Sequence, residues 1–428
     1  MSKAAVTQIV ADRLTAPYKI PLGTTRQIFH LKSRIAILTT HPIQYHAPWF
    51  RALAGHPEID LKVFYCHHAT PQEQAKAGFG FEFDWDVSLL DGYTHYFLKN
   101  VSARPGVNGF FGLDTPEMKE IIERESFDAV LINGWHYKSA WQAMRACWKT
   151  KTPVMVRSDS HLHTNRSTGK AIAKWPFYRW FIPKLDACVS VGQWSRDYFL
   201  HYGANPDRIF TIPHVVDDSY FTHEVERLRP QRRELRARWE LDPQATILLF
   251  AGKFIEKKRP MDFLKALDLA VKRGATVAGL MVGDGPLRAS CEEFVRLKNL
   301  PAHFTGFLNQ SEITEAYVAA DALVLPSDGG ETWGLVVNEA MTCGLPVFVS
   351  DHVGCGPDMI TNETGYVFPL ADNAALAELI SSFAADKAKR EFMSEQAKRM
   401  AGWYSPASAA DATLLAVQSV TKTRRRDL

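Results

Sequence analysis

The sequence predicts an α/β protein made of two Rossmann-like, doubly wound domains that face each other across a cleft. Short apolar runs of strand length alternate with stretches of helical periodicity, as in repeated βαβ units. This alternation stops and restarts once within the 428 residues. A chain of this length usually contains more than one hydrophobic core, so two domains are expected.

The first series of apolar runs begins at RIAILTT (34–40) and continues with LKVFYC, FDAVLI, TPVMVRS and DACVSVG. Polar or helical segments separate the runs, and Thr115 is predicted to cap a helix that begins at Pro116. Runs that are apolar throughout are typical of strands buried on both faces of a parallel sheet. We therefore expect residues 1–33 to be an N-terminal extension and residues 34–221 to form the first domain.

An arginine-rich, poorly apolar stretch from Glu224 to Arg238 follows and is interpreted as the link between the domains. A merely solvated amphipathic helix is compatible with that role, so its arginines are given no function. The alternation then restarts with TILLFAG, TVAGLMVGDG, ALVLPS and PVFVSD. We expect a second domain over residues 222–401, and over 402–428 a helix that returns to the first domain and ends in a basic tail.

Composition argues against several classes of protein. The chain has 50 Lys and Arg against 47 Asp and Glu, so its charge gives no sign of a nucleic-acid partner. Residues 1–33 contain no long apolar run and are expected to be neither a secretory signal nor a membrane span. Six scattered cysteines without metal-site spacing favour a reducing cytoplasm: Cys66, Cys147, Cys188, Cys291, Cys343 and Cys355.

Candidate binding residues follow the strands of the second domain, because ligands of doubly wound sheets bind beyond the carboxyl ends of the strands. FAGKFIEKKRP brings Lys253 and Lys258 to a strand end and a helix start, which suits a diphosphate. A surface charge run is the alternative interpretation. VGDGPLR places Gly283 in a turn where the backbone can approach a ligand, although a simple turn explains it equally.

The segment GGETWGLVVNEAMTCGLP places Glu331 in a loop and Glu339 about two helical turns further on. Two carboxylates in this arrangement do not bind one metal without distortion, but they suit separate hydroxyl pairs of an elongated ligand. The free amides of residues 332–335 at the helix start can receive negative charge. Taken alone, the spacing is also explained by a helix with one acid at its front and an exposed acid in its middle.

Together these segments resemble the retaining glycosyltransferases of the GT-B fold, family 4 in particular. The shared order comprises the two lysines, VGDGP, HFTGFLNQSEITEAYVAAD, the two glutamates, EAMTCGLPVFVSD and GCGPDMI. The likeness is strong over about residues 240–370 and weaker from 34 to 221. It implies a hexosyltransferase of polysaccharide biosynthesis that needs no cofactor beyond a nucleotide-diphosphate sugar as co-substrate. The acceptor would be a hydroxyl of a glycan, a lipid-linked molecule or a small molecule.

The resemblance also implies roles for single residues. Glu331 matches the glutamate that faces the donor sugar, and Glu339 matches the one that holds the ribose hydroxyls. Lys258 stands on the usual lysine, whereas Lys253 replaces the usual arginine with a point charge. The implied donor-binding segments contain Thr332, Trp333, Gly334, Leu335, Gly283 and Phe307.

The first domain departs further from the family pattern. A count from Pro153 favours Asp159 over His161 as the residue that faces the donor sugar, and we include Asp159 with the catalytic candidates. His46, His136 and His161 are candidates on the acceptor side. A loop histidine in contact only with solvent explains His161 equally well.

The sequence predicts no metal site. Asp84 and Asp86 in FDWDV form a D-x-D triplet but do not end an apolar strand, and only Asp91 lies nearby as a further hard ligand. Lys253 and Lys258 already supply positive charge for the leaving group. We therefore expect transfer that is independent of divalent metal.

The segment GKAIAKWPFYRWFIPKL (169–185) mixes cations and aromatics, as interfacial helices do. A helix that buries its aromatics against the first domain is the preferred interpretation, and weak peripheral contact with the inner face of the membrane is the other. A catalytically silent GT-B scaffold and a nucleotide-sugar epimerase are the rival functions. The sugar, the base, the acceptor and the oligomeric state are not predicted.

Overall fold

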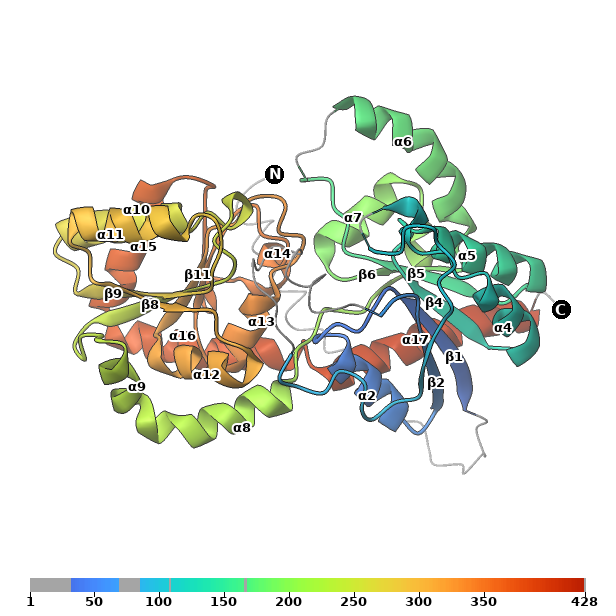
Figure 1. Cartoon of the computed structure of the whole chain (residues 1–428), viewed down its shortest axis with the longest axis horizontal. Coiled ribbons are helices and arrows are strands. Elements are labelled where there is room, and N and C mark those ends of the chain that lie inside the picture. Colours follow the sequence, from blue (N-terminus) through green and yellow to red (C-terminus); the bar gives the residue numbers. More distant parts are fainter. Residues whose placement is uncertain (1–31, 69–84, 108, 165–167, 427–428) are drawn as a thin grey trace, which may run out of the picture. The chain divides into compact units, whose positions relative to one another are not determined.

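The computed structural model describes residues 32–68, 85–107, 109–164 and 168–426 (Figure 1). These residues form two parallel β-sheets covered by helices, which confirms the predicted α/β class with two Rossmann-like domains. Parallel neighbours need long crossover connections, and helices supply them here. Among the described residues, no helix combines the length and the apolarity that crossing a membrane requires.

The sheet of the first half has the strand order β3-β2-β1-β4-β5-β6-β7, and its described neighbours all pair in parallel. Strands β1, β4 and β5 lie at its centre, which explains their apolar sequences. The strand bounds are β1 (Ser33–Thr39), β2 (Ile59–Tyr65), β3 (His95–Phe97), β4 (Ala129–Asn133), β5 (Val154–Ser158), β6 (Ala187–Ser190) and β7 (Ile209–Thr211).

Helices cover both faces of this sheet. On one face the helices α2 and α17 pack against Ile35 and Ile37, and α4, α5, α6 and α7 contribute to the core on the other. The bounds are α2 (Ala47–Gly55), α4 (Glu117–Glu125), α5 (Lys138–Thr150), α6 (Thr168–Phe181), α7 (Gln193–His201) and α17 (Pro406–Arg426). Helix α4 is assigned from Glu117, one residue later than predicted, although Pro116 already adopts helical angles, as the predicted first helical position requires.

The sheet of the second half has the order β10-β9-β8-β11-β12-β13, again with parallel neighbours. Its central strands are apolar and fully buried. The short strands β10 and β13, like β3, were not predicted, because they lie at sheet edges and are only partly buried. The bounds are β8 (Thr246–Ala251), β9 (Val277–Val282), β10 (Ala302–Gly306), β11 (Ala322–Leu325), β12 (Val347–Ser350) and β13 (Gly365–Phe368).

Figure 1 shows helices on both faces of the second sheet as well. The helices α10 (Pro260–Lys272), α11 (Arg288–Lys298) and α15 (Asn373–Ala385) pack on one face. The opposite face carries α8 (Asp218–Leu228), α9 (Arg232–Arg238), α12 (Gln310–Ala319), α13 (Leu335–Thr342) and α16 (Lys387–Gly402). The short helix α14 (Gly356–Met359) follows β12. The arginine-rich stretch is thus mostly helical and packed on the second sheet.

Helix α6 corrects one preferred interpretation. Tyr178 and Phe181 are buried, but Trp175, Phe177 and Trp180 are 46%, 45% and 51% exposed. The expectation that this helix buries its aromatics is therefore wrong for these three side chains. The helix has two aromatic faces, because the aromatic residues occur too densely for one buried stripe.

The last helix, α17, packs on the first sheet, and this packing gives a test of stability. Val417 is fully buried there, whereas Leu415 on the same helix is 51% exposed. We expect Val417→Ala to lower the free energy of unfolding by about 2 kcal/mol, since it removes two buried methyl groups and leaves a cavity.

Leu415→Ala is the matched control, with an expected change within about 0.5 kcal/mol. Urea denaturation of the full chain measures both values. Equal losses from the two variants would show that α17 is not packed in this way.

Candidate active site

Three neighbouring strands of the second sheet end at the same edge and carry the candidate charges. Lys253 follows β8, Gly283 follows β9, and Glu331 follows β11. Because β8 lies between the other two strands, their loops meet. The parallel topology thus brings together residues that are up to 78 positions apart in the chain.

Lys258 and Glu331 form an ion pair that is mostly shielded from solvent, with side chains only 16% and 11% exposed. Burial opposes ionisation of Glu331. The charges of Lys258 and Lys257 outweigh it, so the pKa of Glu331 lies below its usual value. Lys258 ends a short 3-10 helix, η6 (Glu256–Lys258), directly before α10. Glu331 is therefore a carboxylate at neutral pH and is held in place by a lysine.

Lys253 is half-buried close to the same pair. Burial and the neighbouring cations Lys258 and Lys257 lower its pKa to about 8, although Glu331 acts in the opposite direction. A half-buried lysine with two further lysines beside it suits the binding of an anion.

The turn after β9 approaches these lysines closely. Gly283 has a φ of +126°, and a Cβ atom added there would lie 2.0 Å from the carbonyl oxygen of Gly252. Only glycine fits a turn that combines this φ with such a close contact. Phe307, which follows β10, is half-buried.

The segment from Glu331 to Leu335 is fixed mainly by its backbone. Trp333 is only 3% exposed, and its indole nitrogen donates to Asn338 Oδ1 at 2.8 Å. Gly334 adopts a φ of +101° directly before the first residue of α13. Trp333 is therefore a core side chain, and it can meet a ligand only through its backbone.

Glu339 lies in α13 and accepts a hydrogen bond of 2.5 Å from the hydroxyl of Tyr317 on α12. Burial raises the pKa of Glu339 to about 7, and the bond from Tyr317 and the charge of Lys258 only partly offset it. The sequence analysis did not identify Tyr317, because nothing in its own helix distinguishes it from a core tyrosine. The contact joins two helices and is set by their packing.

Asp159 comes from the first sheet, directly after β5. Its carboxylate accepts a hydrogen bond of 2.7 Å from the hydroxyl of Thr332, the neighbour of Glu331. His161 is 1% exposed, and its Nδ1 accepts from the backbone of His163 at 3.2 Å. Of the two candidates at this position, the structure thus brings Asp159 to the Glu331 segment, whereas His161 packs its ring against Trp194.

The remaining histidines lie at two other strand ends. His46 precedes α2, and its buried ring contacts Tyr45, Trp49 and Phe50. Burial and the nearby Arg157 lower the pKa of His46 to about 3, so it is neutral at physiological pH. His136 follows β4, is exposed, and lies against its sequence neighbours Trp135 and Tyr137.

Arg157 is a site residue that the sequence analysis did not identify. It is 6% exposed at the end of β5, and its guanidinium lies 5.0 Å from the Trp49 ring centroid. It donates to the carbonyl oxygens of Ile212 and Pro213 at 3.4 and 3.3 Å. A single arginine that ends an otherwise apolar run, TPVMVRS, was the available signal, because charge in a buried strand is rare.

The loop after β7, to which Arg157 donates, also contacts the second half of the chain. Asn338 of α13 donates to the carbonyl oxygen of His214 at 3.1 Å. Asp358 accepts from the backbone nitrogen of Gln193 at 2.9 Å. The bond between Thr332 and Asp159 connects the first half to the Glu331 segment, and these two bonds connect it to α13 and α14.

The described part of the chain contains no group of three or more His, Cys, Asp or Glu side chains that could hold a metal ion. Asp86 instead accepts a hydrogen bond of 3.0 Å from the backbone of Ser311 at the start of α12. Asp84, its partner in the D-x-D triplet, lies outside the described residues.

Two family models match the chain. Residues 231–400 match glycosyl transferases group 1, and residues 93–220 match glycosyltransferase family 4. Alpha-D-kanosaminyltransferase of Streptomyces kanamyceticus is 28% identical over 267 residues, which are 60% of this chain and 68% of that protein. For other curated relatives the matched part is as little as 34% of their length.

Solved structures share the fold at low sequence identity. A glycosyltransferase from Rickettsia africae ESF-5 has a TM-score of 0.69 and 17% identity, covering 91% of this chain and 99% of its own. Anabaena Alr3699/HepE in complex with UDP has a TM-score of 0.66 and 14% identity, covering 91% and 100%. The two sheets with their strand-end loops are those of the GT-B fold, and the chain belongs to the glycosyltransferase family of group 1 and family 4.

Proposed function

We propose that the chain is a retaining, metal-independent glycosyltransferase that moves a sugar from a nucleotide-diphosphate sugar to an acceptor hydroxyl. One observation carries this proposal. Lys253, Lys258 and a buried, ionised Glu331 meet at one sheet edge, and Glu339 lies about one turn into α13. The names of the structural relatives support it, because HepE was crystallised with UDP and with UDP-glucose.

The charges suit the leaving group. When the bond between the anomeric carbon and the phosphate oxygen breaks, negative charge accumulates on the nucleoside diphosphate and positive charge on the sugar. Lys253 and Lys258 stabilise the negative charge, assisted by the backbone amides at the start of α13. Glu331 orients the donor sugar, and Glu339 binds the ribose hydroxyls as a carboxylate.

The acceptor attacks the face from which the phosphate leaves. Its oxygen forms the new bond to the anomeric carbon, and its proton passes to the departing phosphate oxygen, so the configuration is retained. Asp159 already accepts a hydrogen bond from Thr332, which favours a positioning role on the sugar side. His46, neutral at physiological pH, is suited to hydrogen bonding with a hydroxylated acceptor.

The proposed acceptor is a glycan, a lipid-linked molecule or a small molecule, and a glycan acceptor would place the reaction in polysaccharide biosynthesis. All six cysteines of the chain are free and buried, which supports a reducing, cytoplasmic location. The exposed Trp175, Phe177 and Trp180 of α6 support weak peripheral contact with an anionic membrane.

A panel of nucleotide sugars, scored by thermal shift, tests the proposal first. A donor at 100 times its Kd should add about 2.7 kcal/mol of stability. Proton NMR of the fresh product then reads the anomeric configuration. Inversion would overturn the proposed mechanism, and a chain that neither transfers nor hydrolyses any donor would overturn the proposed activity.

The two glutamates should have different kinetic effects. Glu331→Gln is expected to lower kcat by about 100-fold with little change in donor Kd, because an oriented charge acts mainly in the transition state. Glu339→Ala should instead raise the donor Kd by about tenfold or more, because the hydrogen bonds to ribose are lost. The exposed Glu363 provides a control, Glu363→Gln. Equal behaviour of all three variants would refute these roles.

The affinity for nucleotide should rise with pH, pass through a maximum and then fall. Glu339, with its pKa raised to about 7, becomes a carboxylate as pH rises through 7, whereas Lys253, with its pKa lowered to about 8, loses its charge as pH rises through 8. Binding of UDP, measured by calorimetry, should therefore be tightest between about pH 7 and 8.

Two variants test the rise and the fall of affinity with pH separately. Glu339→Gln should abolish the rise on the acid side. Lys253→Arg should abolish the fall on the alkaline side, because arginine stays charged to about pH 12. A wild-type affinity that is flat from pH 6 to 9 would contradict both assignments.

Transfer should survive removal of metal. Lys253, Lys258 and the amides of α13 supply the positive charge that a divalent ion would otherwise provide. Initial rates after exhaustive EDTA treatment should match those of the untreated protein. A loss of activity that Mg²⁺ or Mn²⁺ restores would show that the charge stabilisation has been misassigned.

The α6 contact can be tested with vesicles. The wild-type chain should sediment with phosphatidylglycerol vesicles at low salt and dissociate at high salt, because screening weakens the contribution of its cations. Replacing Trp175 and Trp180 by Ser should abolish sedimentation. Phe111, which is 71% exposed outside α6, provides the control Phe111→Ser. Failure of the wild type to bind at low salt would end this proposal.

A further inference from the structure

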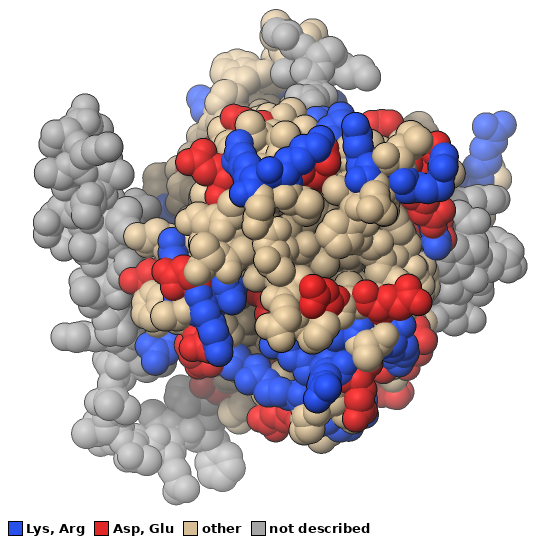
Figure 2. All heavy atoms as spheres, turned by 90° about the vertical axis from the view of Figure 1, so that its left-hand side faces the viewer, with Lys and Arg blue, Asp and Glu red and all other residues tan. Residues whose placement is uncertain are grey.

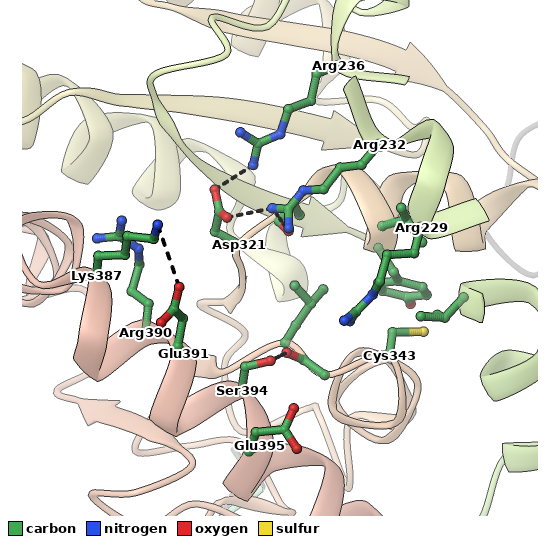
Figure 3. A pocket seen from close by; sticks show the side chains of 16 residues that line it. Arg229, Arg232, Arg236, Asp321, Cys343, Lys387, Arg390, Glu391, Ser394 and Glu395 are labelled. Atoms are coloured by element: carbon green, nitrogen blue, oxygen red, sulfur yellow. Dashed lines mark hydrogen bonds and ion pairs between the residues drawn. The ribbon is translucent and has the colours of Figure 1, made fainter. Parts of the chain in front are cut away.

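A basic pocket lies on the second domain, outside the proposed donor site (Figure 3). Its volume is about 510 Å³, and α8, α9, α12, α16 and the end of α13 form its walls. Its five cationic side chains, which define the name basic pocket, are Arg229, Arg232, Arg236, Lys387 and Arg390. On the face shown in Figure 2, Lys and Arg side chains gather along the upper edge and again in the lower part, in both places with Asp and Glu side chains beside them.

Two of these cations serve the fold. Arg232 and Arg236 donate to the two carboxylate oxygens of Asp321 at 2.6 and 2.7 Å. Asp321 also accepts from the backbone nitrogen of Ile247 at 2.7 Å. Both oxygens of the Asp321 carboxylate therefore accept hydrogen bonds. Its single negative charge balances only one of the two positive charges of Arg232 and Arg236.

The other three cations have weaker or fewer interactions with carboxylates. The Arg229 guanidinium has no hydrogen bond or ion pair with any described residue, and Figure 3 shows it directed toward the middle of the pocket. Within the described ranges, Lys387 pairs with Glu391 alone, at 3.8 Å, and both side chains are more than two-thirds exposed. Arg390 donates through one nitrogen to the carbonyl oxygens of Phe383 and Ala384.

The acidic residues leave the positive charge in excess. Glu395 forms an ion pair of 2.8 Å with Lys398, which does not line the pocket. Glu391 and Lys387 form an exposed pair, which contributes little energy. Arg229 also acts on Glu395, but the five cations of the pocket exceed its three carboxylates, Asp321, Glu391 and Glu395, so the space between the walls keeps an excess of positive charge.

The size and the floor of the pocket indicate the class of ligand. A volume of about 510 Å³ is far larger than one small ion needs and lies in the range of metabolite sites. Val225, Val318 and Leu345 provide an apolar surface between the charged walls. This combination suits a compact organic molecule that carries phosphate, since arginine and lysine are the usual phosphate ligands.

We propose that the basic pocket is a second ligand site, for a small phosphorylated molecule. Its phosphate lies between Arg229 and the Lys387–Arg390 wall, and its body covers the apolar floor. This site does not depend on the proposed transferase function, because it shares no lysine with the donor site.

Calorimetric titration with pyrophosphate tests the site. The pocket variant carries Arg229→Gln and Lys387→Gln, both at exposed positions. The matched control carries Arg233→Gln and Arg399→Gln, which remove the same charge from exposed positions on the same two walls outside the pocket. We expect pyrophosphate to bind the pocket variant at least tenfold more weakly than the wild type and the control.

Any binding at the donor lysines is common to all three proteins and cancels in the comparison. Thermal unfolding without ligand should be the same for the three, and Lys387→Gln alone provides a milder variant. Equal pyrophosphate binding by the pocket variant and the control would overturn the proposal.

A second arm separates a free molecule from a lipid headgroup. The three proteins are sedimented with phosphatidylglycerol vesicles at low salt. Equal sedimentation assigns the pocket to a free small molecule. Sedimentation that only the pocket variant loses would assign it to lipid phosphate and overturn the small-molecule proposal.

Discussion

All-parallel strand pairing is the constraint on which the rest of this structure depends. Every parallel neighbour requires a crossover, so helices cover both faces of each sheet and the loops after the strands gather at one edge. In the second half the central strands β9, β8 and β11 carry Gly283, Lys253 and Glu331. In the first half the central strands β1, β4 and β5 are followed by His46, His136 and Asp159. The candidate site is a direct result of strand order.

The charged side chains at this edge of the second sheet change one another's pKa values. Glu331 keeps its charge because Lys258 and Lys257 are near, whereas burial, followed by the charges of Lys258 and Lys257, lowers the pKa of Lys253. An arriving diphosphate would bring negative charge close to Lys253 and so raise the pKa of this lysine. The cost of keeping these cations close together is thus offset by ligand binding, as is common for sites that stabilise a leaving group.

The sequence was sufficient for features that depend on local pattern. Apolar runs with abrupt ends identified the central strands and the loops after them, whereas the resemblance to a known family was needed to single out Lys253, Lys258 and Glu331 within those loops. The sequence was insufficient for contacts that depend on how helices pack against each other. Tyr317 contacts Glu339 only because α12 and α13 lie on the same face of the sheet.

Burial set a further limit on prediction. The exposure of Trp175 and Trp180 depends on the neighbours of α6, because its aromatics are spread around the helix. The short strands β3 and β13 have few residues and partial burial, so their sequences resemble those of loops. The basic pocket joins Arg229 to Lys387, which are far apart in the chain and have ordinary surface sequences.

Tyr317 stands between two regions that have been described separately. Tyr317 is among the residues that line the basic pocket, its ring is buried, and its hydroxyl donates to the carboxylate of Glu339. A molecule that pressed on this ring from the pocket would alter the hydrogen bond on the other side. Thermodynamic reciprocity then requires that a nucleotide bound at Glu339 change the affinity of the pocket by the same factor. One side chain would make the two sites a coupled pair.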